Sequence, residues 1–171
     1  IQTCAIVAIL WGFLTSPAIG VVTIGVLAAM ALYGRLKAKL GVAANIVVSV
    51  LASLPFFYGA GAAGRPAAGL PLLAIGIPIH FAREVEKDVQ DVAGDRGKKN
   101  TLAIVLGVPI ARRVAAGATV VFIVAWVAYM GTRWTTWPVV IIALTALYAN
   151  RPSIYKAAMA VALVAYYVSP P

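Results

Sequence analysis

The chain has 171 residues, of which 63% are hydrophobic and only 11% are charged. This composition excludes an ordinary soluble domain and indicates a membrane protein. The formal net charge is +9, but the basic residues stand in small groups between long apolar runs, which fits lipid head groups better than nucleic acid. Cys4 is the only cysteine, so a disulfide or a cysteine-based zinc site within one chain is excluded.

Seven apolar segments could cross a membrane. A bilayer core about 30 Å thick needs ~20 helical residues, and several segments are shorter, which favours a compact bundle of tilted or broken helices. In chain order the predicted spans cover residues 1–14, 18–33, 43–58, 66–81, 114–130, 137–148 and 154–168. Breaks are expected at Pro55 and Pro78, although neighbouring helices can also accommodate such prolines. The sequence predicts an all-α, polytopic transmembrane bundle, with residues 1–171 forming a single domain.

The seven spans divide the basic residues unequally between the two sides of the membrane. Only Arg65 and Arg133 fall on one side. The other twelve of the fourteen lysines and arginines share the opposite side: Arg35, Lys37, Lys39, Arg83, Lys87, Arg96, Lys98, Lys99, Arg112, Arg113, Arg151 and Lys156. Positively charged loops are retained in the cytoplasm, so this side is predicted to be cytoplasmic.

All five acidic residues lie close together after the fourth predicted span. They are Glu84, Glu86, Asp88, Asp91 and Asp95. On a continuous helix, four of them, all but Glu86, share one face beside an apolar stripe of valines, so an amphipathic helix is predicted. Like charges at this spacing repel one another and call for cations.

Magnesium is the expected cation, because it prefers hard oxygen ligands and usually joins one or two carboxylates to the phosphates of a substrate. Positive charge that could hold phosphate oxygens comes from Lys87, Arg96, Lys98 and Lys99. A plainer interpretation is a solvated helix of mixed charge at the membrane surface, which needs no ligand.

Two motifs resemble the UbiA-type intramembrane prenyltransferases. Residues 83–96 read REVEKDVQDVAGDR, with Thr101 and Leu102 shortly after, and are similar to the second aspartate-rich motif of that family. Residues 33–37 read YGRLK, followed by Asn45, and resemble its Tyr-x-x-x-Lys motif. Among the branches of the family, residues 83–96 are most similar to the archaeal digeranylgeranylglyceryl phosphate synthases.

The resemblance implies a protein of about nine spans with a further aspartate-rich motif between its second and third spans. That motif, of the form Asn-Asp-x-x-x-Asp, is absent here, so the chain resembles spans three to nine and is expected to hold half of the metal site. The loop after Asp95 is about one residue shorter than in the family pattern, which affects the alignment of Lys98 and Lys99.

The resemblance also implies roles for individual residues. Asp91 and Asp95 would be the main Mg²⁺ ligands and Asp88 a supporting one. Tyr33 and Lys37 would face the reacting end or the acceptor. A second set would bind the substrate diphosphate: Lys87, Arg83, Lys98 and Asn45. By composition alone, Tyr33 fits an interfacial anchor and Lys37 a snorkelling charge, and His80 fits a capping or packing residue at a helix end.

The reaction implied is transfer of a prenyl group, here geranylgeranyl, from its diphosphate to an acceptor, with release of pyrophosphate. The acceptor would be a geranylgeranylglyceryl phosphate or, as second choice, an aromatic acid or quinone precursor such as 4-hydroxybenzoate. Two other classes of function remain open. A transporter would carry ionisable groups near the centre of the membrane, and an assembly subunit would use the acidic stripe to bind a basic partner.

Overall fold

The computed structural model of the protein describes residues 2–98 and 100–169, and for residue 2 and residues 34–40 it describes the backbone alone. Every described element is helical, which confirms the all-α prediction. The longer helices are α1 (Gln2–Thr15), α2 (Pro17–Leu40), α3 (Ala43–Ala62), α4 (Leu70–Gln90), α7 (Val108–Met130), α8 (Thr136–Ala149) and α9 (Pro152–Val168). Three short elements connect them, namely η1 (Pro66–Gly69), α5 (Val92–Asp95) and α6 (Leu102–Val105).

The long helices correspond one by one to the seven predicted spans. By length and composition, three described stretches could cross a membrane: Ala43–Ala62, Pro66–Gln90 and Val108–Met130. Four shorter apolar helices accompany them, at Thr3–Thr15, Pro17–Tyr33, Thr136–Ala149 and Pro152–Val168. The chain therefore forms a polytopic helical bundle.

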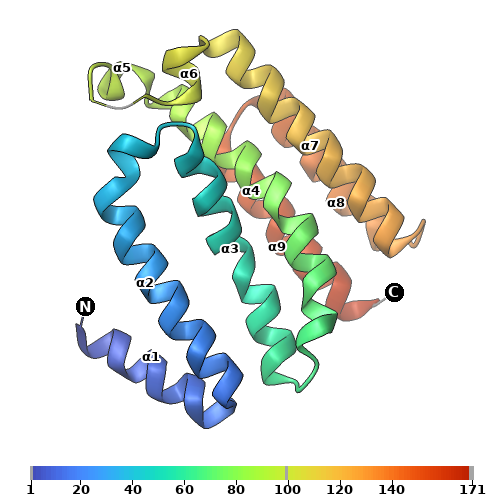
Figure 1. The fold of residues 1–171 in the computed structure, drawn as a ribbon. Coiled ribbons are helices and arrows are strands. Elements are labelled where there is room, and N and C mark those ends of the chain that lie inside the picture. The colour runs from blue at the N-terminus through green and yellow to red at the C-terminus, as the bar shows by residue number, and fades with distance from the viewer. Residues whose placement is uncertain (1, 99, 170–171) are drawn as a thin grey trace.

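Helix α4 is the centre of the bundle, because it packs against α3 on one side and against α7 and α9 on the other, as Figure 1 shows. Small residues are deeply buried in the second half of the chain. Alanines at positions 111, 115, 143, 146 and 158 are at most 1% exposed. Small side chains let helices approach closely, which is how helices pack in lipid.

Local signals explain where several helices begin. The Ser16 hydroxyl accepts a hydrogen bond from the Ile19 amide at 3.2 Å, and Pro17 stands in the first turn of α2. A serine cap followed by proline is a favoured helix start. Helix α9 likewise begins at Pro152, after Asn150 has ended α8 in the left-handed conformation with φ of 50°.

The structure decides two questions of helix continuity. Helices α3 and α4 run through Pro55 and Pro78 without ending, as neighbouring helices can allow. The acidic segment is not one continuous helix either, since α4 ends at Gln90 and α5 begins at Val92, with Asp91 between them. The stripe is thus split into an α4 part, with Glu84 and Asp88, and a part at the turn, with Asp91 and Asp95.

Candidate functional site

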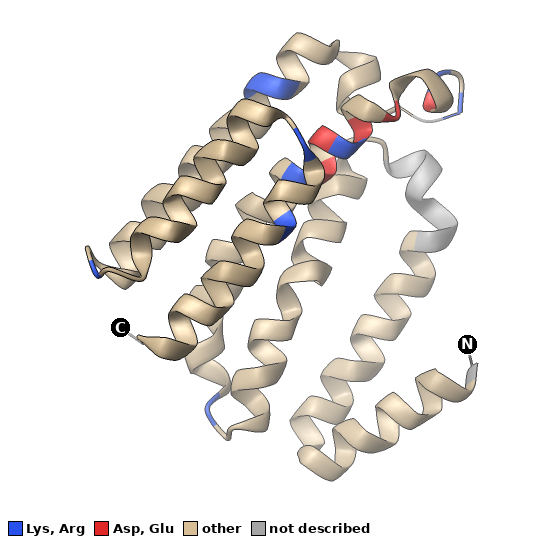
Figure 2. Ribbon diagram, turned by 180° about the vertical axis from the view of Figure 1, so that it is seen from behind, with Lys and Arg blue, Asp and Glu red and all other residues tan. Residues whose placement is uncertain are grey.

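A polar cavity of about 100 Å³ lies between α2, α3 and α4, where the acidic residues gather at one end of the bundle in Figure 2. Residues from distant parts of the sequence line it: Tyr33, Gly41, Ala44, Asn45, Glu84, Lys87, Asp88 and Thr101. Four of these were predicted from the sequence as site residues, namely Tyr33, Asn45, Lys87 and Asp88. The fold therefore brings the two sequence motifs to one place.

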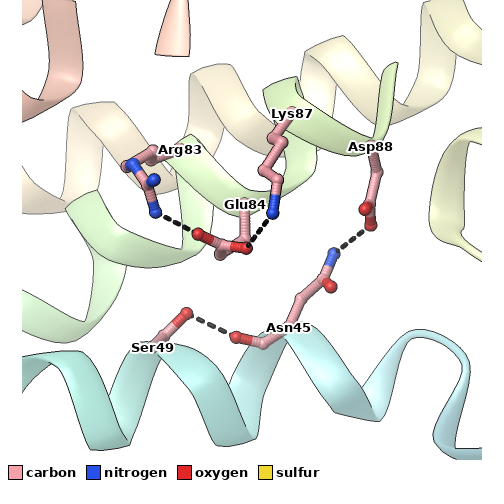
Figure 3. A network of polar contacts seen from close by, with 6 residues as sticks. All are labelled: Asn45, Ser49, Arg83, Glu84, Lys87 and Asp88. Atoms are coloured by element: carbon pink, nitrogen blue, oxygen red, sulfur yellow. Dashed lines mark hydrogen bonds and ion pairs between the residues drawn. The ribbon is translucent and has the colours of Figure 1, made fainter. Parts of the chain in front are cut away.

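A hydrogen bond across the cavity joins α3 to α4. The Asn45 side-chain amide donates to Oδ2 of Asp88 at 2.8 Å, and Figure 3 shows the two side chains pointing toward each other. Asn45 is buried in the first turn of α3, and its carbonyl oxygen accepts from the Ser49 hydroxyl. A charge-assisted bond of this length between helices fixes the orientation of the carboxylate.

Glu84 lies one turn earlier on α4 and faces the same cavity. Its carboxylate pairs with the Arg83 guanidinium and lies 3.9 Å from the Lys87 ammonium (Figure 3). The Lys87 side chain is 54% exposed, so a pair at this distance contributes little to stability. The ammonium can instead turn toward an anion that enters the cavity.

The turn between α2 and α3 shapes the floor of the cavity. Gly41 has φ of +52°, and a Cβ there would lie 2.9 Å from the Asn100 carbonyl oxygen. Only glycine adopts this positive φ without strain and also leaves room for the Asn100 carbonyl oxygen. This close approach brings the loop after α5 onto the α2–α3 turn, which places Thr101 at the cavity.

Thr101 is a buried residue at this site, with 5% exposure. Its hydroxyl has no hydrogen-bond partner among the described residues. A buried polar atom without a hydrogen-bond partner costs free energy. Because the Thr101 hydroxyl lies beside a polar cavity, a ligand or water in that cavity is the expected partner for its hydrogen bond. The sequence showed Thr101 only as part of the motif resemblance, and no local pattern reveals that its hydroxyl is buried.

Four other predicted site residues with described side chains, Arg83, Asp91, Asp95 and Lys98, do not line the cavity. Asp91 is exposed at the end of α4, and Asp95 is half-buried at the end of α5. Lys98 donates to the Gly94 carbonyl oxygen at 3.1 Å, and Arg83 pairs with Glu84. Lys37 belongs to the part of α2 whose side chains the structure does not describe, and the basic residue Lys99 lies outside the described residues.

Two further sequence expectations can be compared with the structure. Glu84 and Glu86 are 9% and 1% exposed, so the acidic segment of α4 is not simply a solvated surface helix. His80 lies inside α4 rather than at a helix end, and it lines a small internal space with Phe122 and Trp126. The packing interpretation of His80 fits this position.

The donor atoms at the cavity fit magnesium shared with a substrate. Glu84 and Asp88 offer carboxylate oxygens from one face of α4, and Asn45 carries an amide oxygen beside them. Within the described residues no group of three or more His, Cys, Asp and Glu side chains is close enough to form a complete cage. Mg²⁺ is commonly held by one or two carboxylates together with substrate phosphates.

Comparison with known proteins gives a consistent result. The family model described as "UbiA prenyltransferase family" matches residues 1–167. The digeranylgeranylglyceryl phosphate synthase of Halobacterium salinarum is 45% identical over 82 residues, which cover 47% of this chain and 29% of that protein. The synthase of the same name from Thermococcus sibiricus is 30% identical over 120 residues, or 70% of this chain and 43% of that protein.

A third relative, the digeranylgeranylglyceryl phosphate synthase of Natronomonas pharaonis, is 37% identical over 110 residues, covering 63% of this chain and 39% of that protein. In these three relatives the matched stretch spans less than half of the relative's own length. No solved structure gives a significant match.

Proposed function

The chain belongs to the UbiA prenyltransferase family, and from this premise we propose that the whole protein transfers a geranylgeranyl group from its diphosphate to a geranylgeranylglyceryl phosphate. The products would be digeranylgeranylglyceryl phosphate and pyrophosphate. The names of the relatives from three archaeal species support this acceptor. An aromatic acceptor such as 4-hydroxybenzoate is the second candidate.

The polar cavity is the observation that carries the proposal. It gathers a lysine, two carboxylates, an asparagine and a buried threonine hydroxyl at the end of an otherwise apolar bundle. A diphosphate needs cations and hydrogen-bond donors, and a divalent metal needs carboxylates, so this set serves both parts of a metal-bound diphosphate.

The chain's own residues have distinct tasks in this mechanism. Lys87 would bind the diphosphate, and the Thr101 hydroxyl would donate to one of its oxygens. Asp88, oriented by Asn45, would hold Mg²⁺ together with phosphate oxygens of the substrate. The family resemblance implies Asp91 and Asp95 as further metal ligands, although neither lines the cavity. When bound, the metal would act as a Lewis acid that stabilises negative charge on the departing oxygens.

The reaction then breaks one bond and forms another. The bond between the allylic carbon and the diphosphate oxygen breaks, and its electron pair leaves with pyrophosphate. The acceptor hydroxyl oxygen bonds to the same carbon, and its proton passes to the departing pyrophosphate. Tyr33 lines the cavity from α2 and would face the reacting carbon or the acceptor, as would Lys37.

The surrounding bundle would protect the allylic cation from water. The helices that flank the site are almost entirely apolar below the level of Glu84, and all acidic residues of the chain lie at 84–95. Exclusion of water prevents hydrolysis of a reactive intermediate. Twelve of the fourteen basic residues fall on this side in the predicted topology, so we propose that the site lies at the cytoplasmic side of a cell membrane.

The transporter and assembly-subunit alternatives receive less support. A transporter would place ionisable groups in the middle of its spans, whereas the acids here lie near helix ends. An assembly subunit would not need the two motifs to meet at a cavity, nor a buried hydroxyl beside it. Family membership also favours the transferase.

A transfer assay with the full-length protein tests the proposal. Radiolabelled geranylgeranyl diphosphate and Mg²⁺ would be supplied with geranylgeranylglyceryl phosphate or 4-hydroxybenzoate, beside an Asp91→Ala, Asp95→Ala variant. We expect labelled lipid and pyrophosphate from the first acceptor and neither from the variant. Transfer to the aromatic acid alone would correct the acceptor, and no transfer to either by folded protein would refute the proposal.

A further inference from the structure

A large groove lies at the end of the bundle opposite the polar cavity. It has a volume of about 740 Å³ and runs between α3, η1, the start of α4 and the end of α9. Small residues, such as Ala60, Ala63 and Ala68, hollow out one side, and Tyr166 and Tyr167 border the other. An apolar chain of lipid size fits a groove with these walls.

A single cation stands at the edge of this groove. Arg65, in the loop between α3 and η1, is part of the groove's lining and is exposed. The five acidic residues of the sequence all lie at 84–95, near the beginning of α3. The 20 residues of α3 separate that end from Arg65 by roughly 30 Å. The acidic segment therefore supplies no carboxylate to Arg65.

The backbone holds Arg65 firmly beside the groove. Its amide donates to the Ala60 carbonyl oxygen at 2.8 Å, across the end of α3. Just beyond, η1 packs directly on α3, since a Cβ at Gly69 would lie 2.6 Å from the Phe56 carbonyl oxygen. The backbone of Arg65 and the groove are thus parts of one corner of the bundle.

We propose that this corner binds an anionic phospholipid of the membrane, with the phosphate on Arg65 and one hydrocarbon chain in the groove. A guanidinium is well suited to phosphate, with which it can form two parallel hydrogen bonds. The groove supplies the apolar surface that a chain requires. This lipid would bind on the membrane face opposite the proposed reaction site, so the inference does not depend on the proposed function.

The test measures lipid binding to the full-length, delipidated protein by native mass spectrometry. Phosphatidylglycerol and phosphatidylcholine with the same acyl chains are titrated separately. We expect phosphatidylglycerol to bind more tightly, and Arg65→Gln to weaken its binding about fivefold, which corresponds to ~1 kcal/mol for one arginine at an anionic head group. The Arg65→Gln variant should lose the preference between the two lipids.

Two matched variants make the test specific. Arg133→Gln removes the other basic residue that residues 1–171 place on the same predicted side. Arg133 does not line the groove, so this variant should leave binding unchanged. Gly59→Leu should weaken binding of both lipids, because Gly59 borders the groove and a Cβ there meets no heavy atom within 4 Å. Ala68→Leu serves the same purpose if Gly59→Leu does not fold.

Three results would overturn the proposal. Equal binding of the two lipids to the wild-type protein would show that the net negative charge of the head group has no role. An equal loss in Arg65→Gln and Arg133→Gln would show general attraction of cations to the surface. Unchanged binding in both groove-filling variants would show that no chain occupies the groove.

Discussion

Asp88 and Glu84 show how neighbouring residues give two carboxylates different environments. Glu84 lies between Arg83 and Lys87 on its own helix, whereas Asp88 accepts a hydrogen bond from Asn45 on α3. The first arrangement depends only on sequence neighbours, and the second exists only because α3 and α4 pack together. Asp88 is therefore the acid whose orientation the tertiary fold controls, which suits a metal ligand.

Thr101 gives a prediction in which stability and binding change in opposite directions. Thr101→Val removes a buried hydroxyl that has no partner among the described residues, so we expect thermal stability to be unchanged or to rise by up to ~1 kcal/mol. Diphosphate binding should weaken, because the substrate loses a donor. Thermal unfolding and titration with a non-hydrolysable prenyl diphosphate measure the two effects.

Thr119→Val is the matched control for this prediction. The Thr119 hydroxyl donates to the Ala115 carbonyl oxygen at 2.9 Å and lies 3.4 Å from the Tyr155 hydroxyl. Its loss should cost about 1 kcal/mol of stability and leave diphosphate affinity unaltered. If Thr101→Val destabilised the protein as much as Thr119→Val and bound diphosphate normally, Thr101 would be a structural residue only.

The contact between α3 and α4 brings Asn45 of α3 to the side chains that α4 contributes to the cavity. Gly76 lets the two helices approach closely. A Cβ at Gly76 would lie 3.0 Å from Oγ of Ser53 and 3.2 Å from Cε2 of Phe56. Gly76→Val should therefore force the helices apart and cost about 1–3 kcal/mol. Transfer activity should fall as well, since Asn45 would move away from Asp88.

Gly117→Val is the control that separates the steric effect of Gly76→Val from the change in helix propensity between glycine and valine. Gly117 lies in α7, where a Cβ meets nothing within 4 Å, so valine should be tolerated or slightly stabilising relative to glycine. Chemical unfolding of both variants gives the comparison. Equal stability of the two would show that the α3–α4 distance is not set at Gly76.

The long helices could be predicted well from the hydrophobic runs of the sequence. The structure of the polar segment, residues 83–98, could be predicted less well. The seven apolar stretches became the seven long helices, because burial in lipid demands continuous helical hydrogen bonding. The predicted helix through Asp95 fails at Asp91, where the segment emerges among glycines and neither lipid nor packing requires one continuous helix. Periodicity placed Glu84 and Asp88 on one face correctly, but no local pattern could show that Asn45 reaches Asp88.

At the scale of the whole molecule, the distribution of charge predicts its orientation. The acidic residues gather at one end of the bundle in Figure 2, and on the predicted topology twelve of the fourteen basic residues share that side. The division into two sides follows from sequence alone, since each span reverses the direction of the chain. Whether residues 1–171 form a single domain stays a prediction.

Cysteine labelling in intact cells tests this orientation. In a Cys4→Ser background of the full-length protein with any further cysteines removed, Lys98→Cys and Thr132→Cys each introduce one exposed thiol, near opposite ends of α7. A membrane-impermeant maleimide should label Thr132→Cys from outside, and Lys98→Cys only after permeabilisation. The reverse pattern would place the acidic end outside the cell and contradict the proposed cytoplasmic site.

The most direct test of the central claim, that the polar cavity binds a metal-bound diphosphate, compares two acids of the same helix. Affinity of the full-length protein for a non-hydrolysable geranylgeranyl diphosphate is measured with and without Mg²⁺. Asp88 lines the cavity, whereas the buried Glu86 does not. We expect Asp88→Asn to abolish most of the Mg²⁺-dependent affinity, about tenfold or more, and Glu86→Gln to retain it. Equal affinity in the two variants, or tight binding unaffected by Mg²⁺, would contradict the account.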